Sequence, residues 1–150
     1  MNAAVTAADP RVRYVLRKAM IARVVTVSSS GRPMIMPLWF VVLNGRIYMN
    51  NAATSPTVRN IEADPHVLLV FEGVDGEVVR MRGTARYVRG AAMLRRVVRA
   101  SLPKYYLSPH AVRLTLRDLP RVPTMLRYYR ERTDTGMIEV TPESYSVGPA

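Results

Sequence analysis

Apolar and polar positions along the chain predict strands joined by short turns, and the pattern is clearest between residues 28 and 71. Two apolar runs, at residues 34–43 and 46–51, flank the dipeptide Asn44-Gly45. Asn-Gly between apolar runs is the strongest short signal for a β-hairpin, because both central residues of a type I′ turn need positive φ. We therefore expect a long β-hairpin, then a helical crossover and a returning strand at residues 66–71.

Capping signals and apolar spacing predict two helices around this hairpin. Asp9-Pro10 supplies an N-cap and a first turn, and apolar residues at helical spacing carry the first helix through Ile21: Val12, Val15, Leu16, Ala19 and Met20. A strand is expected at residues 23–28, whereas residues 1–8 are expected to be frayed. Ser55 caps the second helix, which begins at Pro56, where the missing N–H costs nothing, and ends near Asp64-Pro65.

The second half of the chain is expected to add two strands and further helices. Along residues 77–88, Val79 and Met81 alternate with Arg80 and Arg82, so one face of this strand is apolar and the other is rich in arginine. A helix at 90–100 and a strand at 136–141 follow, and residues 142–150 are expected to form a tail. Prolines between residues 101 and 134 exclude one long helix and favour short pieces at 111–119 and 124–132. These prolines are Pro103, Pro109, Pro120 and Pro123.

Six strands with two or three helices, connected mainly as hairpins, predict a mainly β (β+α) fold. The expected architecture is a six-stranded antiparallel β-barrel with flanking helices. A chain of 150 residues is large enough for one domain, spanning residues 1–150, with its own core. No apolar run reaches the roughly 18 residues of a membrane span, and no signal peptide is visible, so we expect a cytoplasmic protein.

The charge of the chain is strongly positive and unevenly distributed. The formal net charge is +11, and residues 80–132 hold fourteen Arg or Lys against only Asp118 and Glu131. Such a segment attracts nucleic acid, acidic lipid or a multiply charged small ligand, although a solvated basic face explains the pattern equally well. Nucleic-acid binding is disfavoured, because neither a recognition-helix motif nor aromatic residues interleaved with the arginines are present.

Few residues in the chain suggest chemistry of their own. There is no cysteine, the two histidines (His66 and His110) are too scattered for a metal cluster, and no nucleophile stands beside a base. Trp39, beside Pro37 in an apolar run, is open to two interpretations: a core aromatic, or a wall for a planar ligand. Polar residues gather where the second helix begins and favour an anion there: Ser55, Thr57, Arg59 and Asn60. Asn60 is equally compatible with a bond to a neighbouring loop. Any chemistry is expected to come from a bound cofactor.

Several of these motifs, in this order, resemble the pyridoxamine-phosphate-oxidase-like split-barrel superfamily, most closely its flavin/deazaflavin-dependent oxidoreductase branch. They are Gly31-Arg32-Pro33, Pro37-Leu38-Trp39-Phe40, the turn at residues 44–48, residues 59–67, Gly83-Thr84-Ala85 and residues 138–142. The resemblance covers residues 21–88 well and the end of the chain loosely, and it does not cover residues 89–134. It implies a split barrel that forms a homodimer, with a flavin-type cofactor in each of two clefts between the subunits.

The resemblance also implies a site and an activity. By position, Met36, Pro37, Leu38 and Trp39 would lie along the cofactor ring, Met49 and Asn50 at the end of the next strand, and Ser55, Thr57 and Asn60 near the phosphate. The family usually has a lysine where this chain has Thr57, which leaves Arg59 as the nearby cation. Coenzyme F420 is the preferred cofactor, because its carboxylate-rich tail suits the basic segment, and FMN is the second choice. The expected reaction is hydride transfer to a small planar electron-poor substrate; the alternative is a non-catalytic carrier or sensor of flavin, haem or another tetrapyrrole.

Overall fold

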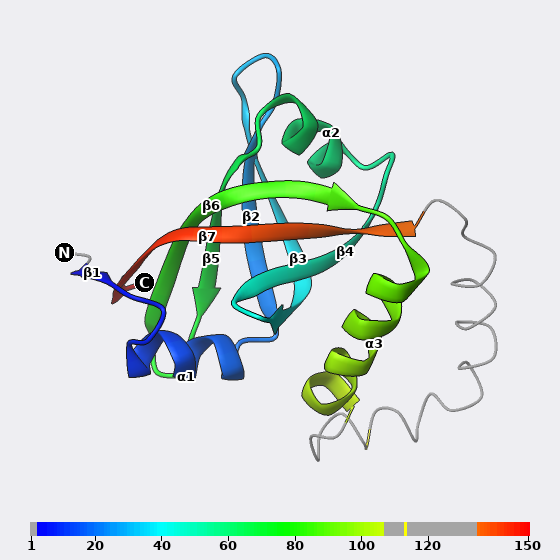
Figure 1. Cartoon of the computed structure of the whole chain (residues 1–150). Coiled ribbons are helices and arrows are strands. Elements are labelled where there is room, and N and C mark those ends of the chain that lie inside the picture. Colours follow the sequence, from blue (N-terminus) through cyan, green and yellow to red (C-terminus); the bar gives the residue numbers. More distant parts are fainter. Residues whose placement is uncertain (1–2, 107–112, 114–134) are drawn as a thin grey trace.

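The computed structural model describes residues 3–106, 113 and 135–150 as an antiparallel sheet closed into a barrel, with helices at its ends and side (Figure 1). The elements are β1 Ala3–Val5, α1 Pro10–Lys18, β2 Ile21–Val27, β3 Pro33–Leu43, β4 Arg46–Ala52, α2 Pro56–Ala63, β5 His66–Glu72, β6 Glu77–Val88, α3 Ala91–Tyr106 and β7 Thr135–Pro149. The strand order is β1-β7-β4-β3-β2-β5-β6, and β7 also pairs with β6. That last pairing closes β2 to β7 into the six-stranded antiparallel barrel expected from the sequence.

The central hairpin forms as its turn signal predicts. Asn44 has φ 51° and Gly45 has φ 76°, the two positive values that a type I′ turn requires. Leu43 pairs with Arg46, and the pairing continues along the strands to Phe40 and Met49. The register of β3 against β4 therefore follows from this turn.

Both predicted N-caps are confirmed, but the first helix is shorter than expected. The Asp9 carboxylate accepts a hydrogen bond from the Arg11 N–H at 2.8 Å, and the Ser55 hydroxyl accepts one from the Val58 N–H at 3.2 Å. The prediction that α1 extends through Ile21 is wrong: Ala19 is already extended, with ψ 135°, and Ile21 pairs with Trp39 in β2. Pairing in the sheet thus prevails over the helical spacing of the last apolar residues.

Both ends of the chain are strands, which corrects two predictions. Residues 142–149 of the expected tail belong to β7, and residues 3–5 of the supposedly frayed N-terminus form β1 against it. Pro142 does not end β7, because it stands opposite Gly83, where the register of β6 against β7 shifts. A proline without an N–H is tolerated at such a bulge. Gly83 is required there, since a Cβ would lie 2.5 Å from the Thr141 carbonyl oxygen.

The helix after β6 is longer than predicted and continues through Pro103. Pro103 cannot donate the usual bond to the carbonyl four residues earlier, so the helix loses one hydrogen bond there. Packing compensates, because Val97 is buried against Val41 on the outer side of the barrel. The predicted helical pieces at 111–119 and 124–132 lie outside the described residues, apart from residue 113.

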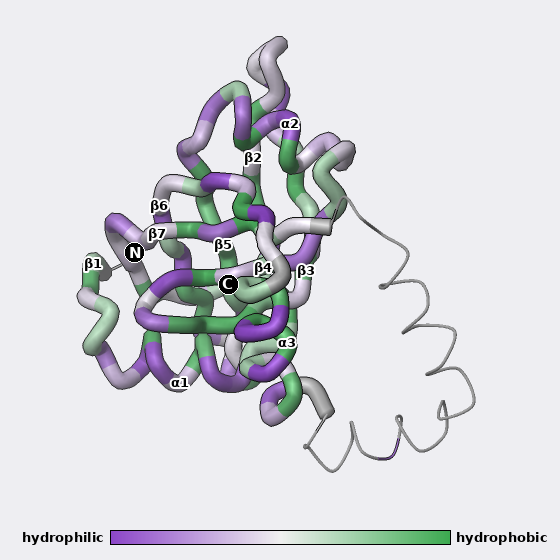
Figure 2. Tube along the Cα trace, turned by 45° about the vertical axis from the view of Figure 1, so that its right-hand side comes forward, coloured by the Kyte–Doolittle hydropathy of each residue, from purple (hydrophilic) through white to green (hydrophobic). Residues whose placement is uncertain are grey.

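The main core fills the barrel. Its fully buried side chains include Phe40, Phe71, Met49, Leu69, Met81 and Ile138, and the rings of Phe40 and Phe71 meet edge to face at 4.8 Å between centroids. A smaller cluster lies between α3 and the outer side of the barrel. Figure 2 shows how hydrophobic and hydrophilic positions alternate along the strands. No helix in the described part of the chain is long and apolar enough to cross a membrane.

Candidate cofactor site

Strand β3 separates the four predicted ring-lining residues into two pairs. Successive side chains of a strand point to opposite faces, so Met36 and Leu38 share the inward side with Phe40, and Leu38 packs against the barrel core. Pro37 and Trp39 point outward, and Trp39 is 59% exposed. The structure therefore places Pro37 and Trp39 together on the outer face, without Met36 and Leu38.

The two predicted site residues at the end of β4, Met49 and Asn50, also point to opposite sides of the sheet. The Met49 side chain is completely buried and pairs with Phe40, so it contributes to the core. Asn50 is exposed and follows Met49 in β4, so its side chain points to the outer side of the barrel. Asn50 thus adds a polar amide to the outer face of β4, where it pairs with Met137 of β7.

The start of α2 satisfies most of its own backbone donors. Pro56 has no N–H, the Val58 N–H is bonded to the Ser55 hydroxyl oxygen, and the Arg59 N–H is bonded to the Ser55 carbonyl at 3.1 Å. The Thr57 N–H is the first-turn donor that an anion would use. Arg59 is exposed and is the one basic residue in α2.

Two buried polar atoms beside the bend between β4 and α2 have no hydrogen-bond partner. They are Oγ1 of Thr57, a residue with 0% exposure, and Nδ2 of Asn51. Buried polar atoms are usually paired, so this bend is the part of the site with unmet polar groups. Because Thr57 is buried, its side chain does not face solvent at the helix start.

Asn60 serves a structural purpose. Its Nδ2 donates to Oγ1 of the buried Thr26 at 3.0 Å and so ties α2 to β2. The sequence left two roles open for Asn60, binding an anion or bonding a neighbouring loop. The structure shows a structural bond, made to strand β2 and not to a loop. Oδ1 of Asn60 keeps its acceptor capacity for a further group.

Tyr87 holds the same bend from the other side. The only signal of this role in the sequence is a tyrosine in an alternating strand. Its hydroxyl donates to the Asn51 carbonyl at 2.8 Å and accepts from the Gly136 N–H at 2.6 Å. Gly136 must lack a side chain, because a Cβ would lie 2.6 Å from the Tyr87 ring. The bend is therefore fixed to β6 and β7.

A buried carboxylate network lies on the outer side of the barrel, and the sequence did not reveal it either. Glu139 is 3% exposed; it accepts from the Tyr48 hydroxyl at 2.8 Å and from Nε of Arg86 at 2.7 Å. Burial raises the pKa of Glu139, but the hydrogen bonds from Arg86 and Tyr48 outweigh it and hold the pKa below its usual value. Burial, with the bond to Glu139, raises the pKa of Tyr48. Among the described residues no three His, Asp or Glu side chains converge as metal ligands.

Comparison with known proteins identifies the family. The model of the pyridoxamine 5'-phosphate oxidase family matches residues 8–146, whereas no protein of curated function matches the sequence. A conserved hypothetical protein of Mycobacterium tuberculosis superposes with a TM-score of 0.71 at 20% identity, over 95% of this chain and 85% of that one.

Two further structures share the fold. An F420 reductase superposes with a TM-score of 0.58 at 19% identity, over 87% of this chain and 92% of that one. The haem storage protein HutZ of Vibrio cholerae superposes with a TM-score of 0.60 at 14% identity, over 94% of this chain and 93% of that one. Identities this low establish a common fold alone, but the family model spans nearly the whole chain. The chain, with its split barrel and its motifs in order, belongs to the pyridoxamine 5'-phosphate oxidase family.

Proposed function

We propose that this protein is an oxidoreductase that binds a flavin-type cofactor on the outer face of β3 and β4 and reduces a small planar electron-poor substrate. The observation that carries the proposal is the exposed pair Pro37 and Trp39 on the outer face of β3. A large exposed aromatic side chain in an apolar surface is typical of a binding site. The fold that this chain shares with an F420 reductase supports the same assignment.

The residues of this chain would bind and orient the cofactor. Pro37 and Trp39 offer a flat apolar surface to a ring, and Asn50 offers an amide to its edge. The Ser55 hydroxyl, the Thr57 N–H and the Arg59 guanidinium would bind a phosphate, and the unpaired amide of Asn51 lies in the same bend. The cofactor, when bound, supplies the hydride. The protein contributes position and the exclusion of water.

A second copy of the chain would complete the site. The outer faces of β2 and β3 expose large apolar side chains to solvent: Ile21 at 43%, Val27 at 37%, Ile35 at 62% and Trp39 at 59%. Apolar surface of this kind is stabilised when a partner covers it. We infer a homodimer that buries this face and encloses the ring. Light scattering at micromolar concentration tests the inference, and a strict monomer would remove it.

Coenzyme F420 is the first choice of cofactor and FMN the second. The preference rests on the charge of the basic segment at residues 80–132, because cations favour the carboxylates of the F420 tail. Arg80 and Arg82 of this segment lie on β6, across the barrel from β3, so they are not assigned to the site. Calorimetric titration with both cofactors decides between them. Arg59→Gln should weaken the binding of either cofactor about tenfold, since a charge-assisted phosphate contact is lost. Arg32→Gln, in the exposed turn before β3, is the matched control. Binding of FMN alone would reverse the preference.

A non-catalytic haem or flavin carrier is the second candidate, and one observation favours it. The exposed His66 side chain has its Nδ1 2.9 Å from the Asp64 carboxylate. That arrangement is typical of metal-ligating histidines and leaves Nε2 for an iron. The visible spectrum of freshly purified protein distinguishes the candidates. A Soret band that is lost in His66→Ala supports the carrier, and hydride transfer from reduced F420 supports the enzyme.

A further inference from the structure

A hollow lies at the end of the barrel opposite α2, between α1, the β3–β4 hairpin and α3. Its volume is about 470 Å³, and its apolar wall comes from Leu16, Val41 and Val42. None of the residues assigned above to the flavin-type cofactor lines it. Pockets of a few hundred Å³ with apolar walls and a few polar groups are typical of small-molecule sites.

The lining carries positive charge only. Arg13 and Arg17 come from α1, Lys104 comes from α3, and no carboxylate of the described residues lines the hollow. Arg13 and Arg17 are four residues apart, so they lie on the same side of the helix. Neither arginine pairs with an acidic residue in the described part of the chain. These two arginines, without an acidic partner among the described residues, make the hollow attractive to an anion.

Lys104 is positioned by defined contacts. Its Nζ donates to the Leu16 carbonyl at 3.2 Å and lies 3.5 Å from the centre of the Phe40 ring. The carbonyl belongs to the last turn of α1, where a cation is favoured by the helix dipole. Burial lowers the pKa of Lys104 to about 8, so the ammonium form still predominates at pH 7. A bound anion would compensate part of the lost hydration.

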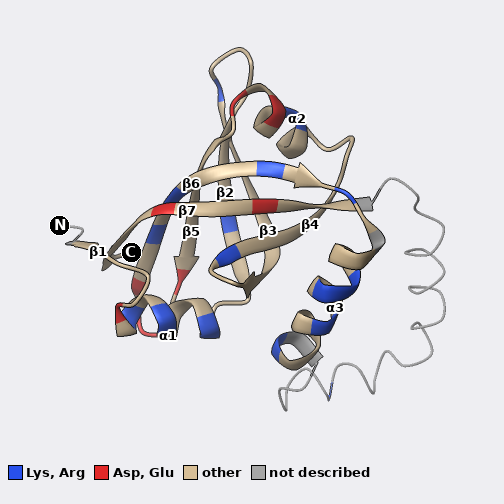
Figure 3. Cartoon of the chain, viewed as in Figure 1, with Lys and Arg blue, Asp and Glu red and all other residues tan. Residues whose placement is uncertain are grey.

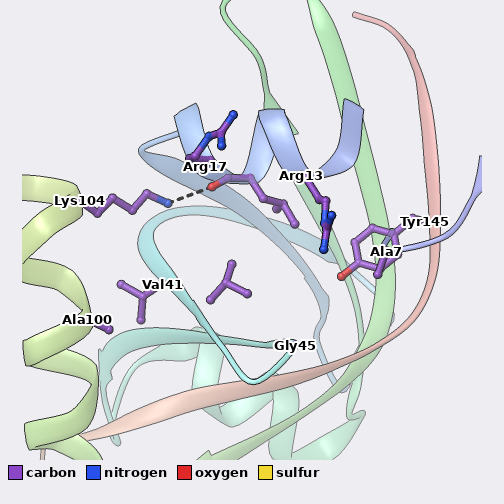
Figure 4. A pocket seen from close by; sticks show the side chains of 10 residues that line it. Ala7, Arg13, Arg17, Val41, Gly45, Ala100, Lys104 and Tyr145 are labelled. Atoms are coloured by element: carbon purple, nitrogen blue, oxygen red, sulfur yellow. Dashed lines mark hydrogen bonds between the residues drawn. The ribbon is translucent and has the colours of Figure 1, made fainter. Parts of the chain in front are cut away.

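Figure 4 shows how these groups are arranged around the hollow. Lys104 reaches from α3 toward α1 above Val41, Arg13 is directed toward Tyr145, and Arg17 stands at the rim and points outward. Apolar side chains and charged groups therefore line the same hollow. A ligand that satisfies both must carry an anionic group on an apolar body.

We propose that this hollow binds a small amphipathic anion, a carboxylate or a phosphate on an apolar body, at a site separate from that of the flavin-type cofactor. Lys104 and Arg13 bind the anionic group, and Leu16, Val41 and Val42 contact the apolar part. Neither the anion alone nor a neutral apolar molecule satisfies the whole site. The site is independent of the proposed redox function.

Calorimetric titration of the full chain with octanoate, octyl phosphate, octanol and acetate tests the proposal. Octanoate and octyl phosphate should bind, and octanol and acetate should bind at least about tenfold more weakly, since each lacks one of the two recognised parts. The relative affinities of octanoate and octyl phosphate identify the preferred head group. Equal binding of octanol and octanoate would overturn the proposal.

Two variants locate the site. Lys104→Met keeps the length of the buried stem, and Arg13→Gln changes an exposed helix residue that the fold does not need; each should weaken octanoate about tenfold. Lys18→Met, an exposed change on the same helix outside the hollow, should leave octanoate binding unchanged. Octanoate should also bind equally with F420 or FMN present, whichever cofactor binds. Unchanged binding in both Lys104→Met and Arg13→Gln, or competition with the cofactor, would overturn the proposal.

Discussion

At the scale of single residues, Thr57 is the position at the start of α2 where the chain departs from what the resemblance implies. The resemblance places a lysine at this position, but here the side chain is fully buried and its hydroxyl oxygen lacks a partner. A buried unpaired hydroxyl costs about 1–3 kcal/mol. Thr57 therefore stabilises the fold less than an apolar residue of the same shape, and it does not replace the charge of a lysine.

Thr57→Val should leave the free energy of unfolding unchanged or raise it by about 1 kcal/mol, because the unpaired hydroxyl is removed. Thr57→Lys should lower it by about 2–4 kcal/mol, because an ammonium replaces a buried group. Urea denaturation measures both values. Thr54→Val, at the exposed bend nearby, is the control. A Thr57→Lys protein as stable as wild type would show that this side chain reaches solvent.

Lys104 predicts a dependence of stability on alkaline pH. Its pKa is about 8 in the folded protein against 10.5 in a free lysine, so the unfolded chain binds more protons between these values and stability rises with pH. In Lys104→Met that contribution is absent. The stability difference between wild type and Lys104→Met should therefore change from pH 7.5 to 10, whereas Lys18→Met should show a constant difference. A constant difference for Lys104→Met would contradict the assigned burial of this amine.

At the scale of elements, the features encoded by local sequence signals were predicted, whereas those that depend on long-range strand pairing were not. The Asn44-Gly45 turn, the caps at Asp9 and Ser55 and the alternation of β6 are encoded within a few residues, and all of them are confirmed. β1 and the second half of β7 form only because partner strands lie beside them. The Gly83 bulge that accepts Pro142 depends on the same pairing, which no local pattern reveals.

The candidate site was predictable to the same degree. The resemblance located the hairpin and the start of α2, and strand alternation then separates the exposed Trp39 from the buried Met49. The partners of Glu139 lie more than fifty residues away in the chain, so its burial in a charged network could not be deduced from an apolar strand. The hydrogen bonds of Tyr87 to Asn51 and Gly136 could not be predicted either, because these partners are also distant in the sequence.

The Glu139 network joins three strands and should stabilise the barrel. Glu139→Gln should lower the free energy of unfolding at pH 7 by about 1–3 kcal/mol, because the hydrogen bonds from Arg86 and Tyr48 lose their charged acceptor. The pKa of Glu139 is lowered in the folded state, so its contribution is complete above the ordinary value of 4.5 and is lost as pH falls further.

Thermal or urea unfolding of Glu139→Gln and wild type from pH 7 down to pH 3 tests this prediction. The difference between the two proteins should shrink as the solution is acidified. Glu62→Gln, at an exposed position of α2, should show little difference at any pH. A Glu139→Gln effect that is independent of pH would contradict the ionised state of the carboxylate.

At the scale of the whole molecule, the basic residues spread over several elements, and Arg23, paired with Glu72, lies on β2 between the exposed Ile21 and Val27. Figure 3 shows basic residues along β6 and α3, and the exposed apolar residues of β2 and β3 lie on the outer face of the barrel. Arg86 is paired with Glu139 and Arg80 donates to the Pro149 carbonyl, so part of the basic surface is structural. The apolar face is the surface on which a second copy and a planar cofactor would lie.

A flavin-type ring is proposed to lie against Trp39, and the fluorescence of this residue reports on that contact. Trp39 is the single tryptophan of the chain, so its emission reports on one position. Titration with F420 or FMN should quench the emission saturably. Trp39→Ala should weaken the binding of the same cofactor about tenfold in calorimetry, since the loss of a stacked aromatic contact costs about 1–1.5 kcal/mol. Val74→Ala, in the exposed turn between β5 and β6, should bind as wild type does. Tight cofactor binding that neither quenches Trp39 nor weakens in Trp39→Ala would contradict the placement of the site.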